Sequence, residues 1–110
     1  MRRPNDRIYS LHAAVCRALG HPTRMKLLDL LRDGEECVCR LAPKVGITES
    51  HLSQILAILR RAGLVETRRE GHSIFYRIRD ERIFEVLDRM REILADQLAE
   101  VEDLALTLRP

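Results

Sequence analysis

The chain has 110 residues, of which 45% are hydrophobic and 33% charged, with a formal net charge of +2. This length predicts one small domain spanning residues 1–110, and we expect neither a signal peptide nor a membrane-spanning segment. We therefore expect a cytoplasmic protein with no membrane partner. The three cysteines, an odd number in a reducing compartment, argue against a structural disulfide framework.

Two helices are predicted at the start of the chain. Apolar residues at helical spacing predict an amphipathic helix at 8–19, which the glycine and proline at 20–22 interrupt. Pro22 suits the first turn of a second helix, and Gly34 is a natural place for that helix to stop.

A helix-turn-helix is predicted at 39–61. Proline inside a helix clashes with the carbonyl four residues earlier, so Pro43 predicts that a short third helix begins at about Cys39 and leaves Cys37 outside. Thr48 can cap the next helix, expected at 49–61 with its leucines on one apolar side.

A hairpin and a long helix are predicted to follow. Residues 64–69 and 73–78 are rich in β-branched and aromatic side chains and are joined by a glycine-containing turn, which predicts a β-hairpin at 64–78. Apolar residues then recur every three or four positions along 82–108. A helix of that length has nothing of its own to cover the stripe, so we expect the terminal helices, 8–19 and 82–108, to form a homodimer.

This order of elements is that of a winged helix-turn-helix, a mainly α fold with a small β-hairpin wing. The helix at 49–61 would lie in the major groove of double-stranded DNA. Short polar side chains near its start could face the bases: Glu49, Ser50, His51, Ser53 and Gln54. Basic side chains of the hairpin suit the phosphate backbone: Arg68, Arg69, His72 and Arg77.

Two cysteines, Cys37 and Cys39, stand one residue apart in a polar stretch. Within a regular helix they would point about 200° apart, but the sulfurs can converge if the helix begins only at Cys39. A helix N-terminus also favours thiolate, the form that binds metal. With Cys16, from the same subunit or its twin, they would supply three thiolates for As(III) or a soft divalent ion.

Several motifs make the chain resemble the ArsR/SmtB family of bacterial metal-sensing repressors. The resemblance covers nearly the whole chain and rests on ALGHPTR at 18–24, ECVCRL at 36–41, LRRAGLV at 59–65, and REG at 69–71 with FY at 75–76. It implies a dimer that binds an operator palindrome without effector and releases the DNA when effector binds.

The resemblance also implies the effector. Thiolate sites at the third helix imply arsenite, antimonite, cadmium or lead as ligand, bound here by Cys37 and Cys39. Cys16 departs from the family pattern, because it lies within the first predicted helix while cadmium-type members carry cysteines on a looser N-terminal arm. Zinc is less favoured, because Arg82 and Ile93 stand where histidines are expected in zinc-type members. Metal binding is expected to displace the third helix and, with it, the recognition helix.

Two alternatives stay open at this point. The same repressor could sense thiol oxidation or persulfide, in which case we expect Cys16 as the disulfide partner, because a ring closed between Cys37 and Cys39 would be small and strained. From another class, the chain could be a thiol metal-buffering module that dimerises through its long helix. An enzyme is not expected, because the sequence has no phosphate-cradling glycine loop and no nucleophile–base set.

Overall fold

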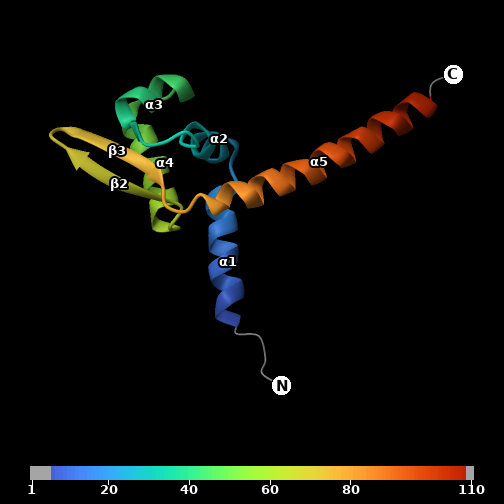
Figure 1. Ribbon diagram of the computed structural model, residues 1–110, viewed down its shortest axis with the longest axis horizontal. Helices are drawn as coiled ribbons and strands as arrows, with labels where there is room; N and C mark the ends of the chain where they lie inside the picture. The colour runs from blue at the N-terminus through green and yellow to red at the C-terminus, as the bar shows by residue number, and fades with distance from the viewer. Residues whose placement is uncertain (1–5, 109–110) are drawn as a thin grey trace. The chain divides into compact units, whose positions relative to one another are not determined.

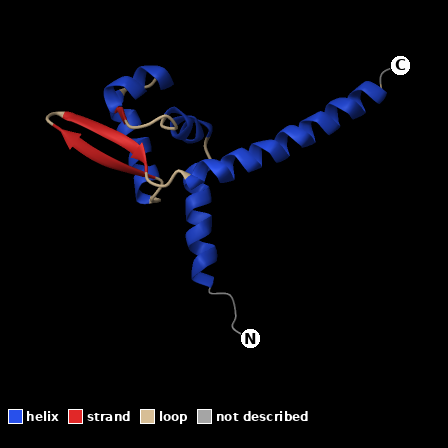
Figure 2. Cartoon of the chain, viewed as in Figure 1, coloured by secondary structure: helices blue, strands red, loops and turns tan. Residues whose placement is uncertain are grey.

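The computed structural model describes residues 6–108, in which helices dominate and a small antiparallel sheet is the only β structure (Figures 1 and 2). The mainly α fold with a β-hairpin wing is therefore confirmed. The chain divides into two compact units, residues 1–80 and 81–110. The expected domain of 1–110 also includes residues 1–5 and 109–110, which lie outside the described residues.

The first two helices form where the sequence predicts them. Helix α1 spans Asp6–Leu19, and helix α2 spans Pro22–Leu30. His21 is the N-cap of α2, and its Nδ1 accepts a hydrogen bond of 3.2 Å from the backbone N–H of Thr23. The predicted stop at Gly34 lies beyond the helix, which ends at Leu30; Gly34, with φ of 139°, belongs instead to the loop that follows.

Helix α3 spans Val38–Val45 and begins one residue earlier than predicted. Cys37 lies outside it, as expected, and is its N-cap in an extended conformation, with φ of −74° and ψ of 142°. Gly46 ends the helix in the left-handed region, at φ of 80°, where a side chain would be strained.

Helix α4 spans Glu49–Arg61 and is the second helix of the helix-turn-helix. Thr48 caps it as predicted, because its Oγ1 accepts a hydrogen bond of 3.1 Å from the backbone N–H of His51. One side of α4 is fully buried in the core of this unit, through Leu52, Leu56 and Leu59.

The sheet has three antiparallel strands in the order β1-β3-β2. Strand β2 (Val65–Glu70) and strand β3 (Ser73–Ile78) form the predicted hairpin, with Gly71 at φ of 60° in the turn. Strand β1 (Glu36–Cys37) was not predicted, because two residues are too few to show the alternation of a strand. It ties the start of α3 to the hairpin.

Helix α5 spans Arg82–Thr107 and lies in the second unit, which begins one residue before it at Glu81. A row of apolar side chains along it is exposed: Val86, Met90, Ile93, Leu94, Leu98, Val101, Leu104, Leu106 and Leu108. Charged residues alternate with this row, and no helix within residues 6–108 is both long enough and apolar enough to cross a membrane.

Candidate nucleic-acid interface and thiol pair

Helix α4 presents a polar side opposite its buried leucines. All five side chains predicted to face DNA bases are exposed: Glu49, Ser50, His51, Ser53 and Gln54. Their spacing places them in the first two turns, the part of a recognition helix that reaches base edges. The local sequence thus builds an accessible row of short donors and acceptors on a helix anchored by its other side.

The two cysteines of the 36–41 motif meet at the start of α3. Cys37 is buried and Cys39 is exposed, and the Sγ of Cys37 accepts a hydrogen bond of 3.3 Å from the backbone N–H of Cys39. The structure joins them in a disulfide, with Cα atoms 5.2 Å apart. Our expectation of Cys16 as the disulfide partner is therefore wrong. Cys37 is extended at the N-cap, and this conformation turns its side chain back over the first helical turn.

Cys16 lies apart from this pair. It is an exposed free cysteine on α1. Among residues 6–108, no three His, Cys, Asp or Glu side chains are grouped so that they could hold a metal ion. Within the described residues of one chain, two of the three predicted thiolate ligands, Cys37 and Cys39, therefore lie together, and the third, Cys16, lies apart from them.

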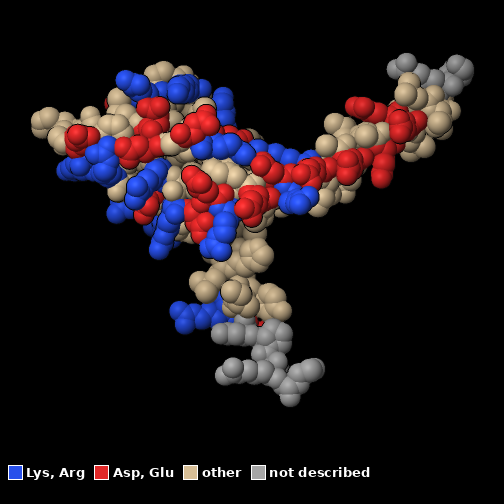
Figure 3. Space-filling view, in the orientation of Figure 1, with Lys and Arg blue, Asp and Glu red and all other residues tan. Residues whose placement is uncertain are grey.

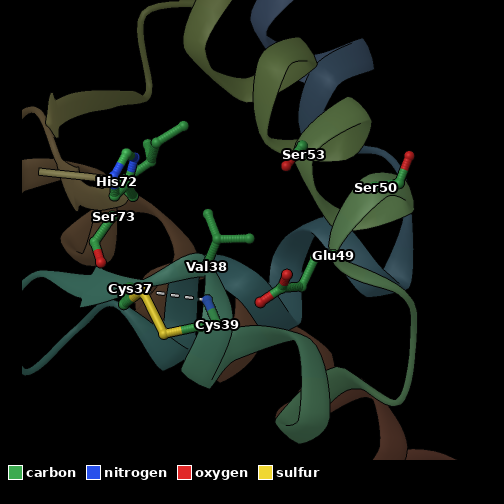
Figure 4. A pocket seen from close by; sticks show the side chains of 9 residues that line it. Cys37, Val38, Cys39, Glu49, Ser50, Ser53, His72 and Ser73 are labelled. Carbon is green, nitrogen blue, oxygen red and sulfur yellow. Dashed lines mark hydrogen bonds between the residues drawn. A yellow bond between two sulfur atoms is a disulfide. The ribbon is translucent and has the colours of Figure 1, made fainter.

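A cavity of about 390 Å³ places the thiol pair beside the polar side of α4. Cys37 and Cys39 form one wall, as Figure 4 shows. The start of α4 supplies Glu49, Ser50 and Ser53, and the hairpin supplies His72, Ser73 and Ile74. The cavity therefore joins the thiols to predicted DNA contacts from both the recognition helix and the wing.

Two of the four basic side chains of the wing are held in ion pairs. Arg68 binds the carboxylates of Glu35 and Glu70, with 2.8 Å between its Nη1 and the Oε2 of Glu70. Arg77 binds Glu66, with 2.9 Å between Nε and Oε1. On the face shown in Figure 3, acidic and basic side chains alternate over this part of the molecule, so the wing is less basic than its arginine count predicts.

Arg69 and His72 differ from these arginines. Both are exposed at the distal part of the hairpin. Within the described part of the chain, neither has an ion pair to a carboxylate. Of the predicted wing contacts, they are the two whose charge or hydrogen-bonding groups are most available to a phosphate.

The pair formed by Glu35 and Arg68 changes the titration of both groups. The hydrogen bond from Arg68 holds the pKa of Glu35 below its usual range; desolvation opposes this shift, and the charges of Arg68 and Arg77 reinforce it. The hydrogen bonds to Glu35 and Glu70 raise the pKa of Arg68. Both members of the pair therefore stay charged across the physiological range.

The strand register links this pair to the thiols. Phe75 of β3 is paired with Cys37 of β1 on one side and with Arg68 of β2 on the other. The guanidinium of Arg68 also lies over the ring of Phe75, with its Cζ 4.7 Å from the ring centre. Sequence reasoning missed both Glu35 and Phe75. The register of the hairpin itself places Phe75 beside Arg68, whereas Glu35 reaches Arg68 because β1 pairs with the hairpin.

The helix-turn-helix, the polar side of α4 and the hairpin beside it define a winged helix-turn-helix DNA-binding regulator. The family described as "Bacterial regulatory protein, arsR family" matches residues 21–67. The chain belongs to this family of transcriptional regulators.

Individual relatives agree with this assignment. The chain is 39% identical over 105 residues to the uncharacterized HTH-type transcriptional regulator Rv0081 of Mycobacterium tuberculosis, covering 91% of this chain and 92% of that one. Its crystal structure superposes with a TM-score of 0.77 at 38% identity, covering 90% and 97% of the two chains.

Two further proteins extend the comparison. A biofilm growth-associated repressor of Agrobacterium fabrum is 38% identical, covering 74% of this chain and 69% of its own. The homodimeric winged helix-turn-helix domain of Mb0332 from Mycobacterium bovis has a TM-score of 0.79 at 32% identity, covering 91% and 95%.

Proposed function

We propose that this protein is a cytoplasmic repressor that binds a palindromic DNA operator as a homodimer and releases it when a thiophilic metal or metalloid binds Cys37 and Cys39. Arsenite, antimonite, Cd²⁺ and Pb²⁺ are the ligands that suit such thiolates best. The membership of the chain in a family of transcriptional regulators supports the first half of the proposal. The placement of the thiols supports the second half.

DNA recognition is assigned to two elements. The exposed residues of α4 would read base edges in the major groove, with Gln54 and Ser53 suited to hydrogen bonds there. Arg69 and His72 of the wing would contact the phosphate backbone. The exposed apolar row of α5, which water would otherwise cover, supports a dimer that spaces two recognition helices for successive major grooves.

The observation that carries the proposal is the shared cavity. Cys37 and Cys39 line it together with Glu49 and Ser53 of α4 and His72 of the wing (Figure 4). An ion bound to the two sulfurs would therefore lie beside the groups assigned to DNA. It would also replace the sulfur cap of α3, the helix that packs against α4. Ligand and DNA would then oppose each other, with equal coupling in both directions.

A complete metal site would need more than this pair. Thiolates are the metal-binding form, so the disulfide between Cys37 and Cys39 must first be reduced. Trigonal As(III) also needs a third thiolate, and one described chain brings no third ligand to the pair. Cys16 is exposed, and we assign the third thiolate to Cys16 of the second subunit of the dimer.

The test is operator release measured by fluorescence anisotropy, with DNA from upstream of the protein's own gene and with reductant present. We expect arsenite or Cd²⁺ to lower the DNA affinity of the wild type by at least about tenfold, a coupling of about 1.4 kcal/mol. The Cys37→Ser/Cys39→Ser variant should bind DNA and keep it. Equal release in both proteins would rule out the thiol pair as the metal site.

A second candidate is a redox switch at the same two sulfurs. The disulfide between Cys37 and Cys39 favours it, because that bond and a metal thiolate site exclude each other. Two thiols would give two electrons and two protons to a peroxide, which becomes two molecules of water. In metal-free buffer, release of DNA by hydrogen peroxide and its recovery with dithiothreitol would support this candidate, whereas unchanged affinity would exclude it.

A further inference from the structure

We propose that Arg68 is a positioning residue that holds the wing against the segment carrying Cys37, and that it is not one of the phosphate contacts. The inference rests on the proposed DNA-binding function, and it divides the wing arginines into two classes. Arg68 would act through Glu35 and Phe75, whereas Arg69 would contact DNA directly.

Three interactions engage the guanidinium of Arg68 at once. Its Nε and Nη2 donate to the two carboxylate oxygens of Glu35, with 3.3 Å from Nε to Oε2. Its Nη1 donates to Glu70, and its plane covers the ring of Phe75. A fork of this kind uses the geometry of arginine and not only its charge. Three of its five N–H groups already donate to carboxylates, so a phosphate at Arg68 would compete with two negative charges already bound there.

The two carboxylate partners of Arg68 come from different segments of the chain. Glu35 comes directly before β1, thirty-three positions from Arg68 in the chain. Glu70 lies on β2 itself, next to the hairpin turn. The arginine therefore joins the edge of the short strand β1 to the far strand of the hairpin, across Phe75 of β3. A two-residue strand has few backbone hydrogen bonds of its own, so a side-chain bridge contributes much of its anchorage.

The side chain next to Arg68 gives the matched comparison. Arg69 is exposed, and within residues 6–108 no carboxylate forms an ion pair with it. Successive residues of a strand point to opposite sides, so Arg68 and Arg69 face different surroundings although they are neighbours. The same substitution at the two positions therefore separates a positioning role from a phosphate contact.

The first experiment replaces each arginine by lysine and measures the salt dependence of operator affinity. Lysine binds phosphate as a point charge but cannot reproduce the fork or the stacking, so we expect Arg68→Lys to lose affinity by about three- to tenfold and Arg69→Lys to stay within about twofold. Arg69→Ala should reduce the slope of log affinity against log salt by about one for each phosphate contact removed, and Arg68→Ala should leave that slope unchanged.

The second experiment removes the carboxylate partner. Loss of a negative charge near a DNA-binding surface ordinarily strengthens DNA binding. We expect the opposite for Glu35→Gln, a weakening of about three- to tenfold, because the wing loses its anchor. Asp33→Asn, two residues away in the same exposed loop, is the matched loss of charge and should leave the affinity unchanged or raise it.

A DNA-free measurement completes the test. Hydrogen exchange at the backbone amides of residues 36–37 should be faster by about three- to tenfold in Arg68→Lys and Glu35→Gln than in wild type or Asp33→Asn. A reduced salt slope in Arg68→Ala, normal affinity in Arg68→Lys, or unchanged exchange would overturn the inference. If the wild type binds no operator, the proposed function fails, and the exchange result alone decides whether Arg68 anchors the wing.

Discussion

Cys37 and Arg68 are registered against opposite sides of Phe75, so a cysteine of the thiol pair and an arginine of the wing share one row of the sheet. Cys37 is at the same time the N-cap of α3. A chemical change at the sulfur of Cys37 would therefore act directly on two elements, the start of the helix-turn-helix and the strand that supports the wing. This arrangement offers a short physical route between thiol chemistry and both DNA-binding elements.

Gln54 should contribute directly to operator recognition. Its exposed amide on α4 can form paired hydrogen bonds with adenine, so Gln54→Ala should weaken specific binding by about 1–3 kcal/mol without changing nonspecific binding. Gln97→Ala, the same substitution at an exposed position of α5, should have no effect. Anisotropy with the operator and with a scrambled duplex measures both affinities. Equal loss on the two duplexes would contradict base recognition by Gln54.

The N-cap hydrogen bond of α4 should make a measurable contribution to the free energy of unfolding. Thr48→Ala removes the hydroxyl that accepts from the backbone N–H of His51, and we expect the free energy of unfolding to fall by about 1 kcal/mol. Thr48→Ser keeps the hydroxyl and should lose no more than a few tenths of that amount. Urea denaturation followed by circular dichroism compares them. Identical midpoints for the alanine and serine variants would show that the cap contributes nothing.

The apolar row of α5 should be the dimer interface. A glutamate at Leu98 would place a charge in a desolvated seam, so we expect Leu98→Glu to raise the dimer dissociation constant by at least about a hundredfold. Gln97→Glu adds the same charge at the neighbouring polar position and should leave the dimer intact. Sedimentation velocity over a concentration series gives the oligomeric state. A dimeric Leu98→Glu protein would place the interface elsewhere.

The carboxyl group of Glu35 should titrate at a lower pH than an ordinary glutamate. Hydrogen bonding by Arg68 and the charges of Arg68 and Arg77 depress its pKa, while Glu70 faces the same guanidinium. Because the folded pKa is depressed, the stabilisation by this pair is present above the unfolded value, about 4.3, and is lost as the pH falls through the folded value.

Carbon-detected NMR titration of the side chains can follow this group directly. In Arg68→Ala we expect the pKa of Glu35 to rise towards the ordinary glutamate value, because the largest cause of its depression is gone. Asp33→Asn should leave it in place. An unchanged midpoint in Arg68→Ala would mean that the ion pair does not persist in solution.

Local patterns were enough to predict most of the elements. The cap at Thr48 and the apolar side of the 49–61 helix depend on residues a few positions apart, so their spacing along the chain predicts them. The proline at 43 likewise indicated that Cys37 lies outside α3. The five polar residues of α4 are exposed for the same reason, since the leucines of the same helix determine which side faces the core.

Long-range contacts could not be inferred in this way. Strand β1 has only two residues, and its partner strand lies far along the chain, so no periodicity reveals it. The same pairing brings Glu35 to Arg68, which turns an expected phosphate contact into an ion pair. The position of Cys16, apart from the other two cysteines, was equally open from sequence.

The amino-acid sequence by itself determined the winged helix-turn-helix, the exposed polar side of α4 and the presence of two closely spaced thiols, because each depends on near neighbours in the chain. Only the tertiary structure decided which basic side chains remain available, which cysteines meet, and that the thiols share a cavity with the recognition helix and the wing. Those facts depend on how α3, α4 and the sheet pack together, and side-chain pairing across such packing has no signature in local spacing.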